Sequence, residues 1–323
     1  MEKYADLPHP KVIVAYEDKI KGKDFELSHS HEEADTIIPN QVLAASSGTT
    51  LPEIHVWSPD TDVFLLLLDL LSNELIDEKI SLIFRTGTGR HRRLVDINRC
   101  MLAVGKKKSR GLVALHNFYG ADWGGKFCGK SKKTWIKAFI DLEEADPILD
   151  AFAGLGEQTL NSEKHADLFK LIELFICKVY LSNGPLTLPA LRWHLFCTKC
   201  LQGELLPPTR GALWQHLLRS NYITIRDKSY RNLCPTLPDI TENGWFVEDG
   251  LFIPKTTTEL PAPKTVIELQ KCGCKGVCDT KRCSCVKNGI PCTSLCKCFS
   301  TCCDNFKDGI LEGDRDSEDE DLV

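Results

Sequence analysis

The chain has 323 residues, an ordinary hydrophobic content and a formal net charge of −5, which favours a globular protein of two or three domains. Its longest apolar run, Val63 to Leu68, is interrupted by Asp69 and is too short to span a bilayer. The N-terminal segment, Met1 to Pro10, is polar and lacks the apolar region of a secretory signal. We therefore expect a chain that is not secreted and has no membrane span, located in the nucleus or cytoplasm.

Strand-like and helix-like segments alternate along residues 1–142, which is typical of an open α/β sheet that binds ligands at the carboxyl ends of its strands. The segments that carry this pattern are a strand at Lys11–Tyr16, a helix at Glu32–Ala45, buried apolar pieces at Ile54–Trp57 and Val63–Leu68, and a strand at Ile80–Arg85. We assign residues 1–142 to a first, α/β domain.

Helical periodicity dominates residues 143–226, where Leu168, Leu171 and Phe175 fall on one face. Several prolines between 227 and 263 predict an extended connector, with a hairpin around Asp249-Gly250. Residues 264–303 form a cysteine-rich module. Residues 304–323 form an acidic tail that we expect to be disordered.

Ten of the sixteen cysteines lie in the short cysteine-rich module. Such density indicates either a disulfide framework or a metal site. Because nothing in the sequence indicates export to an oxidising compartment, reduced thiols that bind zinc are favoured. The ten candidate ligands are Cys272, Cys274, Cys278, Cys283, Cys285, Cys292, Cys296, Cys298, Cys302 and Cys303.

The spacing of these cysteines favours one shared cluster over separate zinc fingers. Cys-x-Cys pairs alternate with single cysteines a few residues away, which is too crowded for independent tetrahedral sites. Three zinc ions need about twelve thiolate positions, and roughly nine thiolates supply them if three bridge two ions each. One cysteine is then spare, and Cys302 and Cys303 are the candidates.

The stretch KCGCKGVCDTKRCSCVKNGIPCTSLCKC, residues 271–298, resembles the tesmin-like CXC domain, a three-zinc module that binds DNA. It departs after Cys298, where one extra residue precedes the last cysteines. In the better-known modules an aromatic residue before the second Cys-x-Cys pair reaches into a DNA groove, and Arg282 stands at that place here. Lys281 and Arg282 are the expected nucleic-acid contacts. Because the module is only weakly basic, a zinc-stapled protein-interaction scaffold stays open as an alternative.

Acidic residues recur at three expected turns. Helix capping and turn formation explain such residues on their own. If the three turns converged at the end of a strand, their oxygens would suit Mg²⁺ or Mn²⁺, and a pair of such ions is the device for phosphodiester hydrolysis. The acidic residues concerned are Glu33, Asp35, Asp60, Asp62 and Asp122.

These acidic motifs, in their order, resemble those of flap-endonuclease-like members of the PIN nuclease superfamily. The matching segments are Glu33-Ala34-Asp35-Thr36, Asp60-Thr61-Asp62 and Gly120-Ala121-Asp122-Trp123. Residues 125–139 resemble the helix-turn-helix with which these nucleases grip the duplex backbone. The resemblance implies that the five acidic residues ligate metal and that Lys126, Lys130, Lys132 and Lys133 contact phosphate.

The succession of a PIN-like region, a helical segment and a CXC module resembles a family of transposon-derived animal proteins. PIN-like nucleases begin with a strand that ends in an aspartate, and no acidic residue upstream of Glu32 fits that position. The resemblance therefore implies a partial PIN-like sheet and the C-terminal part of a longer protein, or a degenerate mobile-element copy. We expect zinc-dependent DNA binding without cleavage. An active Mg²⁺- or Mn²⁺-dependent nuclease is the alternative, and the sequence leaves the oligomeric state open.

Overall fold

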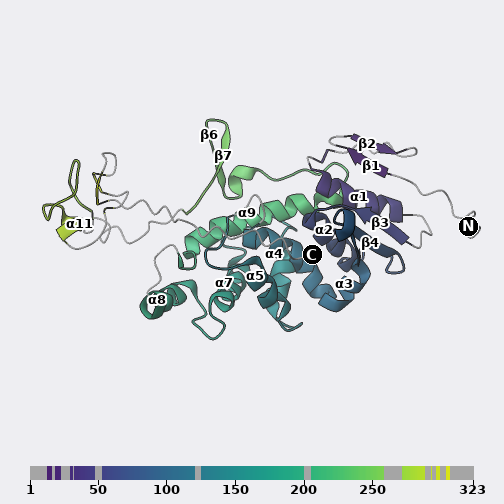
Figure 1. Cartoon of the computed structure of the whole chain (residues 1–323), viewed down its shortest axis with the longest axis horizontal. Coiled ribbons are helices and arrows are strands. Elements are labelled where there is room, and N and C mark those ends of the chain that lie inside the picture. Colours follow the sequence, from purple (N-terminus) through teal and green to yellow (C-terminus); the bar gives the residue numbers. More distant parts are fainter. Residues whose placement is uncertain are drawn as a thin grey trace, which may run out of the picture. The chain divides into compact units, whose positions relative to one another are not determined.

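The computed structural model describes residues 13–16, 19–22, 30–31, 33–47, 53–120, 125–199, 205–257, 271–287, 292, 296–298 and 303–305. The chain divides into two compact units, Met1–Thr258 and Glu259–Val323. The first unit is mixed α/β, with small sheets and many helices (Figure 1). Among the described residues, no helix is long and apolar enough to cross a membrane.

A three-stranded mixed sheet lies at one end of the first unit. Strand β3 (Glu53–Trp57) pairs in parallel with β4 (Ser81–Thr86), and β5 (Arg93–Asp96) pairs antiparallel to β4. A parallel pair needs a crossover, which here is helix α2 (Thr61–Ser72). A separate two-stranded sheet joins β1 (Ile13–Tyr16) to β2 (Lys19–Gly22). The strands expected near residues 11–16 and 80–85 are therefore present, and the apolar segment 54–57, expected to be buried, is a strand in which Val56 is buried but Trp57 is 61% exposed.

Helix α2 forms the centre of the sheet's core. Its side chains are buried on most of its circumference, and Val63, Leu67 and Leu70 are fully buried, as expected for a helix that is apolar all round. Alternate residues of β4, Leu82 and Phe84, point toward it. Three further helices pack against this region: α1 (Ala34–Ser46), α3 (Ile97–Val104) and α4 (Lys106–Gly120).

The helical part of the first unit packs around an aromatic core. Its helices are α5 (Lys132–Ile140), α6 (Pro147–Gly154), α7 (Ala166–Tyr180), α8 (Leu188–Lys199) and α9 (Arg210–Lys228). Phe175 is fully buried, with ring centroids of Phe152 and Trp135 at 5.1 and 5.8 Å. Gly111 allows α4 to approach this core, because a Cβ there would lie 2.8 Å from Phe139.

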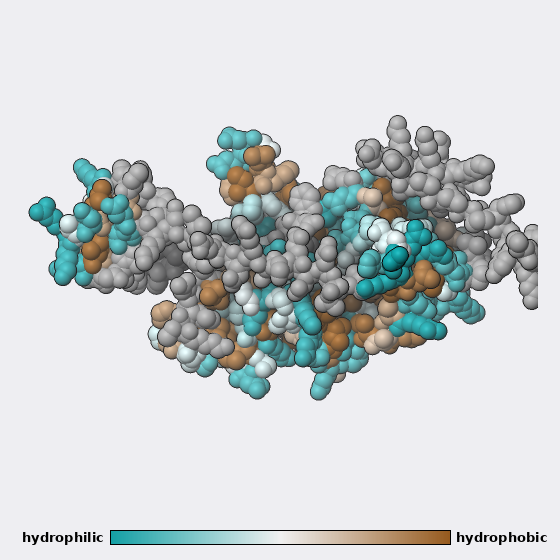
Figure 2. Space-filling model, viewed as in Figure 1, coloured by the Kyte–Doolittle hydropathy of each residue, from teal (hydrophilic) through white to brown (hydrophobic). Residues whose placement is uncertain are grey.

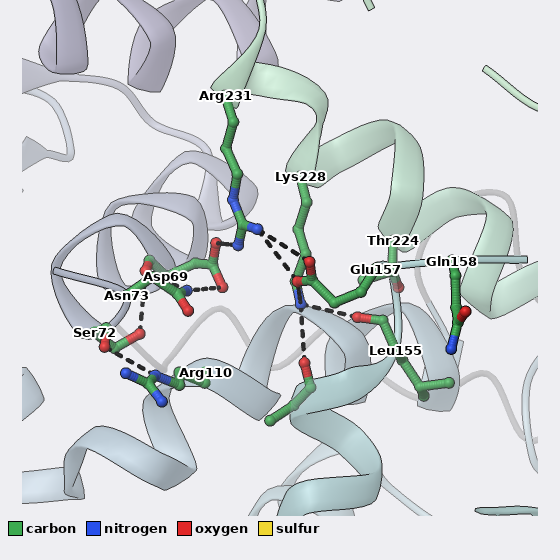
Figure 3. A network of polar contacts seen from close by, with 12 residues as sticks. Asp69, Ser72, Asn73, Arg110, Leu155, Glu157, Gln158, Thr224, Lys228 and Arg231 are labelled. Atoms are coloured by element: carbon green, nitrogen blue, oxygen red, sulfur yellow. Dashed lines mark hydrogen bonds and ion pairs between the residues drawn. The ribbon is translucent and has the colours of Figure 1, made fainter. Parts of the chain in front are cut away.

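The segment that follows α9 is tied to α2 by a buried polar network. Asp69 is fully buried and accepts hydrogen bonds from the Tyr230 hydroxyl at 2.8 Å and the Arg231 guanidinium at 3.0 Å. Arg231 also contacts Glu157, which pairs with Lys228 (Figure 3). An uncompensated buried charge is costly, so this network fixes how α9 and the next residues lie against the sheet region.

A hairpin follows, formed by β6 (Trp245–Glu248) and β7 (Leu251–Pro254), with its turn at Asp249-Gly250 as predicted. Both turn residues have positive φ, 51° and 78°, which is the backbone that Asp-Gly favours in a two-residue turn. The hairpin carries hydrophobic surface (Figure 2), and Val247, Leu251 and Phe252 are more than half exposed.

Candidate metal centres

The core of the second unit consists of cysteines. Seven of them are 4% exposed or less, and Cys274 and Cys303 are half-buried. All described cysteines are free thiols. Cys302 lies outside the described residues. The buried seven are Cys272, Cys278, Cys283, Cys285, Cys292, Cys296 and Cys298.

The buried seven and Cys303 form three overlapping groups of four, in each of which the sulfur atoms lie within 4.8 Å of one another, whereas Cys274 belongs to none of these groups. Zinc–sulfur bonds of roughly 2.3 Å at tetrahedral angles place the sulfurs about 3.8 Å apart. The Sγ atoms of Cys283 and Cys292 are 3.8 Å apart, and those of Cys285 and Cys296 are 3.6 Å apart. The three groups are Cys272/Cys278/Cys283/Cys292, Cys272/Cys285/Cys292/Cys296 and Cys278/Cys292/Cys298/Cys303.

The arrangement of the sulfurs favours a soft divalent cation. Burial raises the pKa of the Cys292 thiol to about 11, so closely packed thiols of this kind ionise only when a cation compensates their charge. Burial opposes ionisation of Cys283 as well, but the backbone N–H groups of Val286 and Cys285 lower its pKa to about 6. The thiol donor set suits zinc, and the cluster could therefore hold this metal.

A second group of potential ligands lies in the first unit, where α1 and α2 begin side by side. Asp35 is in the first turn of α1, Asp60 is the N-cap of α2, and Asp62 is in the first turn of α2. The Asp60 side chain accepts the Asp62 N–H at 2.9 Å. Carboxylate oxygens of these three residues lie within 4.8 Å of one another. Three acidic residues that are up to 27 positions apart in the sequence thus converge, as the sequence motifs predicted.

These carboxylates line a polar pocket of about 290 Å³. Burial, then the charges of Asp60 and Asp62, raises the pKa of Asp35 to about 6. A hydrogen bond from His116, whose Nε2 lies 2.9 Å from Asp62, lowers the pKa of the Asp62 carboxyl. The other lining residues are Glu33, Thr61, His116, Asn117, Lys132, Ile223 and Arg226. The hard oxygen ligands suit Mg²⁺ or Mn²⁺, and such an ion would stabilise the ionised form of Asp35, which burial and the neighbouring carboxylates disfavour.

Glu33 is positioned differently from the three aspartates. Its carboxylate pairs with Arg226 at 2.8 Å, and Arg226 also contacts Asp227 at 2.9 Å. Asp227 is buried, accepts a hydrogen bond from Asn117 at 2.7 Å, and has its pKa raised chiefly by burial. Sequence reasoning missed these contributions from the end of α9. No motif marks them, because Glu33 and Arg226 are brought together only by the tertiary fold.

The expected nucleic-acid contacts differ in accessibility. Lys126, Lys132 and Lys133 are exposed, and Lys132 also lines the acidic pocket. Lys130 is half-buried, and its Nζ lies 3.3 Å from the Tyr180 carbonyl oxygen and 5.0 Å from the ring centroid. In the second unit, Lys281 and Arg282 are exposed beside buried Cys283. Asp122 lies outside the described residues.

Comparison with known proteins finds no family model that matches the chain, and neither a curated protein nor a solved structure matches it.

Proposed function

We propose that this chain is a zinc-dependent nucleic-acid-binding protein with DNA as its partner. In this proposal it originates from a mobile element, acts in the nucleus, and carries an incomplete, inactive PIN-like nuclease region. The observation that carries the proposal is the set of three overlapping four-thiol groups in the second unit. A shared cluster of this kind agrees with the spacing that resembles a CXC domain.

The overlap of the thiol groups supports a content of three zinc ions. Cys272 and Cys278 each belong to two groups, as expected for thiolates that bridge two ions, and Cys292 lies within reach of all three groups. Cys303 belongs to one group, so we assign it as a ligand. When bound, zinc would cross-link the loops of this unit, which has no other large buried side chains among its described residues.

Two exposed basic residues would then make the nucleic-acid contacts. Lys281 and Arg282 immediately precede buried Cys283, so a metal ion on this thiol would hold their backbone in place. Lys and Arg side chains neutralise phosphates, which makes such binding weaker as salt concentration rises. Arg282 also has the planar donor geometry that reads guanine or enters a narrow minor groove.

The proposal is tested by fluorescence anisotropy with a labelled duplex, using the zinc-loaded full chain over a range of salt concentrations. We expect salt-dependent binding that a chelator abolishes. The variant Lys281→Gln/Arg282→Gln should bind several-fold more weakly, whereas the control Lys164→Gln/Lys170→Gln, which removes two exposed charges from the first unit, should bind as the wild type does. Zinc-loaded protein that binds no nucleic acid would contradict the proposal and favour a protein-interaction scaffold.

A second candidate function is a Mg²⁺- or Mn²⁺-dependent, structure-specific nuclease, and the convergence of Asp35, Asp60 and Asp62 favours it. These residues would hold the ion, which when bound supplies Lewis-acid chemistry. His116 would orient Asp62, and Lys132 lies where it would meet a phosphate. Cleavage of single-stranded, duplex or flap DNA that Asp60→Asn/Asp62→Asn abolishes would establish this function. Binding without cleavage would leave the first proposal.

A further inference from the structure

Helix α8 carries an aromatic surface that the proposed function does not use. Leu188, Leu191 and Leu195 are buried and attach the helix to the core, whereas Trp193 is 68% exposed and Phe196 is 54% exposed. The helix lies at the end of the first unit that is remote from the three-stranded sheet (Figure 1). Two large aromatic side chains on the outer face of one short helix indicate an interaction surface.

The two rings are arranged as a continuous platform. Their centroids are 6.2 Å apart and their planes are inclined by only 30°, because residues three apart lie on the same side of a helix. We define the α8 platform as Trp193 and Phe196. Exposed aromatic rings are suited to stacking with other flat rings.

The charge around the α8 platform favours a polyanionic partner. Helix α8 (Leu188–Lys199) contains Arg192 and Lys199 but no aspartate or glutamate. Arg192 donates to the Pro207 carbonyl oxygen, and among the described residues it forms no ion pair with a carboxylate. A partner that combines flat rings with negative charge is therefore complementary to this helix, whereas a helix without acidic residues offers no ion pair to a basic partner.

We propose that the α8 platform stacks with unpaired bases of a single-stranded nucleic acid. The proposal rests on the proposed nucleic-acid-binding function. It adds a second contact, which prefers single strands, to the contact that Lys281 and Arg282 would make. Bases stack on exposed aromatic side chains with little regard to sequence, and basic groups nearby follow the phosphates. In a duplex the faces of the bases are covered by their neighbours, so duplex binding does not use the platform.

The test compares affinities of the zinc-loaded full chain for a labelled single-stranded oligothymidine and for a labelled blunt-ended duplex. Trp193→Ala/Phe196→Ala should weaken single-strand binding by at least about fivefold, since one stacked base contributes about 1–3 kcal/mol, and should leave duplex binding unchanged. The matched control is Leu251→Ala/Phe252→Ala, which truncates two exposed hydrophobic side chains of the protein's β6–β7 hairpin. This control should leave both affinities unchanged.

A conservative variant gives a second measurement. Trp193→Phe keeps an aromatic face and should retain single-strand affinity. If the platform binds the bases, the oligonucleotide should quench tryptophan fluorescence in the wild type, and this quenching should be lost in Trp193→Phe. Equal single-strand affinity of Trp193→Ala/Phe196→Ala and the wild type would overturn the inference, as would wild-type protein that binds the duplex alone. Loss of self-association in that variant, with unchanged oligonucleotide binding, would assign the platform to protein contacts instead. Wild-type protein that binds neither probe would contradict the proposed function itself.

Discussion

The two units of this chain are stabilised by different means. The first contains an extensive apolar core, with fully buried aromatic side chains such as Trp135, Phe152 and Phe175. The second unit has a core of thiols. Among its described residues, Val286 is the aliphatic side chain that packs, partly buried, against this core. A segment so short cannot bury enough apolar surface to fold unaided. The first unit should therefore fold without metal, and the second only with it.

Metal removal should give the largest effect on this comparison. Structural zinc contributes about 10–16 kcal/mol of apparent folding free energy in small modules, so a chelator should unfold the second unit completely. The first unit should retain its helices and its melting temperature. Circular dichroism at 222 nm, together with amide hydrogen exchange of residues 271–287, distinguishes the two responses. Loss of the first unit's melting transition on chelation would contradict the division into two independently stabilised parts.

A cavity in the aromatic core should have the opposite selectivity. Phe175→Ala removes a fully buried ring from its contacts with Phe152 and Trp135, and such truncations cost about 3–5 kcal/mol. Urea denaturation should show this loss in the first unit while the zinc content of the protein stays unchanged. The control Phe252→Ala, at a 58% exposed position, should change the free energy of unfolding by less than about 0.5 kcal/mol.

The sequence predicted most where the responsible residues are neighbours in the chain. The hairpin turn at Asp249-Gly250 could be predicted because a two-residue turn needs positive φ at both positions, which Asp and Gly adopt readily. The helix expected at 32–45 is present as α1, Ala34–Ser46. The thiol cluster could also be predicted from the sequence, because its ligands lie within a short stretch whose spacing restricts the possible metal sites.

Prediction failed where one side chain comes from a distant helix. Arg226 and Asp227 meet Glu33 and Asn117 across more than a hundred residues of chain. The sequence placed residue 227 at the start of an extended connector, whereas α9 continues to Lys228 and Tyr230 is fully buried. Such contacts depend on how the helices pack, which neither local propensity nor spacing encodes.

Acid should weaken the first unit through one buried histidine. Burial and the charge of nearby Arg219 together lower the pKa of His216 from its ordinary 6.5 to about 4, although its hydrogen bond to the Phe118 carbonyl oxygen opposes this shift. The unfolded chain therefore binds more protons between pH 6.5 and about 4, so the free energy of unfolding falls as pH decreases through this window. The expected loss is on the order of 3 kcal/mol.

Urea denaturation of the wild type and His216→Gln at several pH values measures this contribution. The variant should be less stable at neutral pH but should lose less stability between pH 7 and pH 4.5. His91→Gln, at an exposed position, should reproduce the pH dependence of the wild type. If His216→Gln and the wild type had parallel profiles, the acid sensitivity would have to arise from other groups.

The smallest effect should come from the acidic pocket, and it sharpens the contrast between thiol and carboxylate ligands. An ion that binds only the folded state at ten times its dissociation constant stabilises it by about 1.4 kcal/mol. Mn²⁺ should therefore raise the melting temperature of the first unit by a few degrees. In Asp60→Asn/Asp62→Asn this increase should disappear, because two of the three converging carboxylates are removed. Asparagine at position 60 still caps α2, so lost capping does not explain the result.

The control Glu143→Gln/Glu144→Gln removes two exposed carboxylates elsewhere and should keep the full Mn²⁺ response. An equal response in all three proteins would mean that Mn²⁺ acts by general screening, and the convergence of Asp35, Asp60 and Asp62 would then reflect only the adjacent starts of two helices.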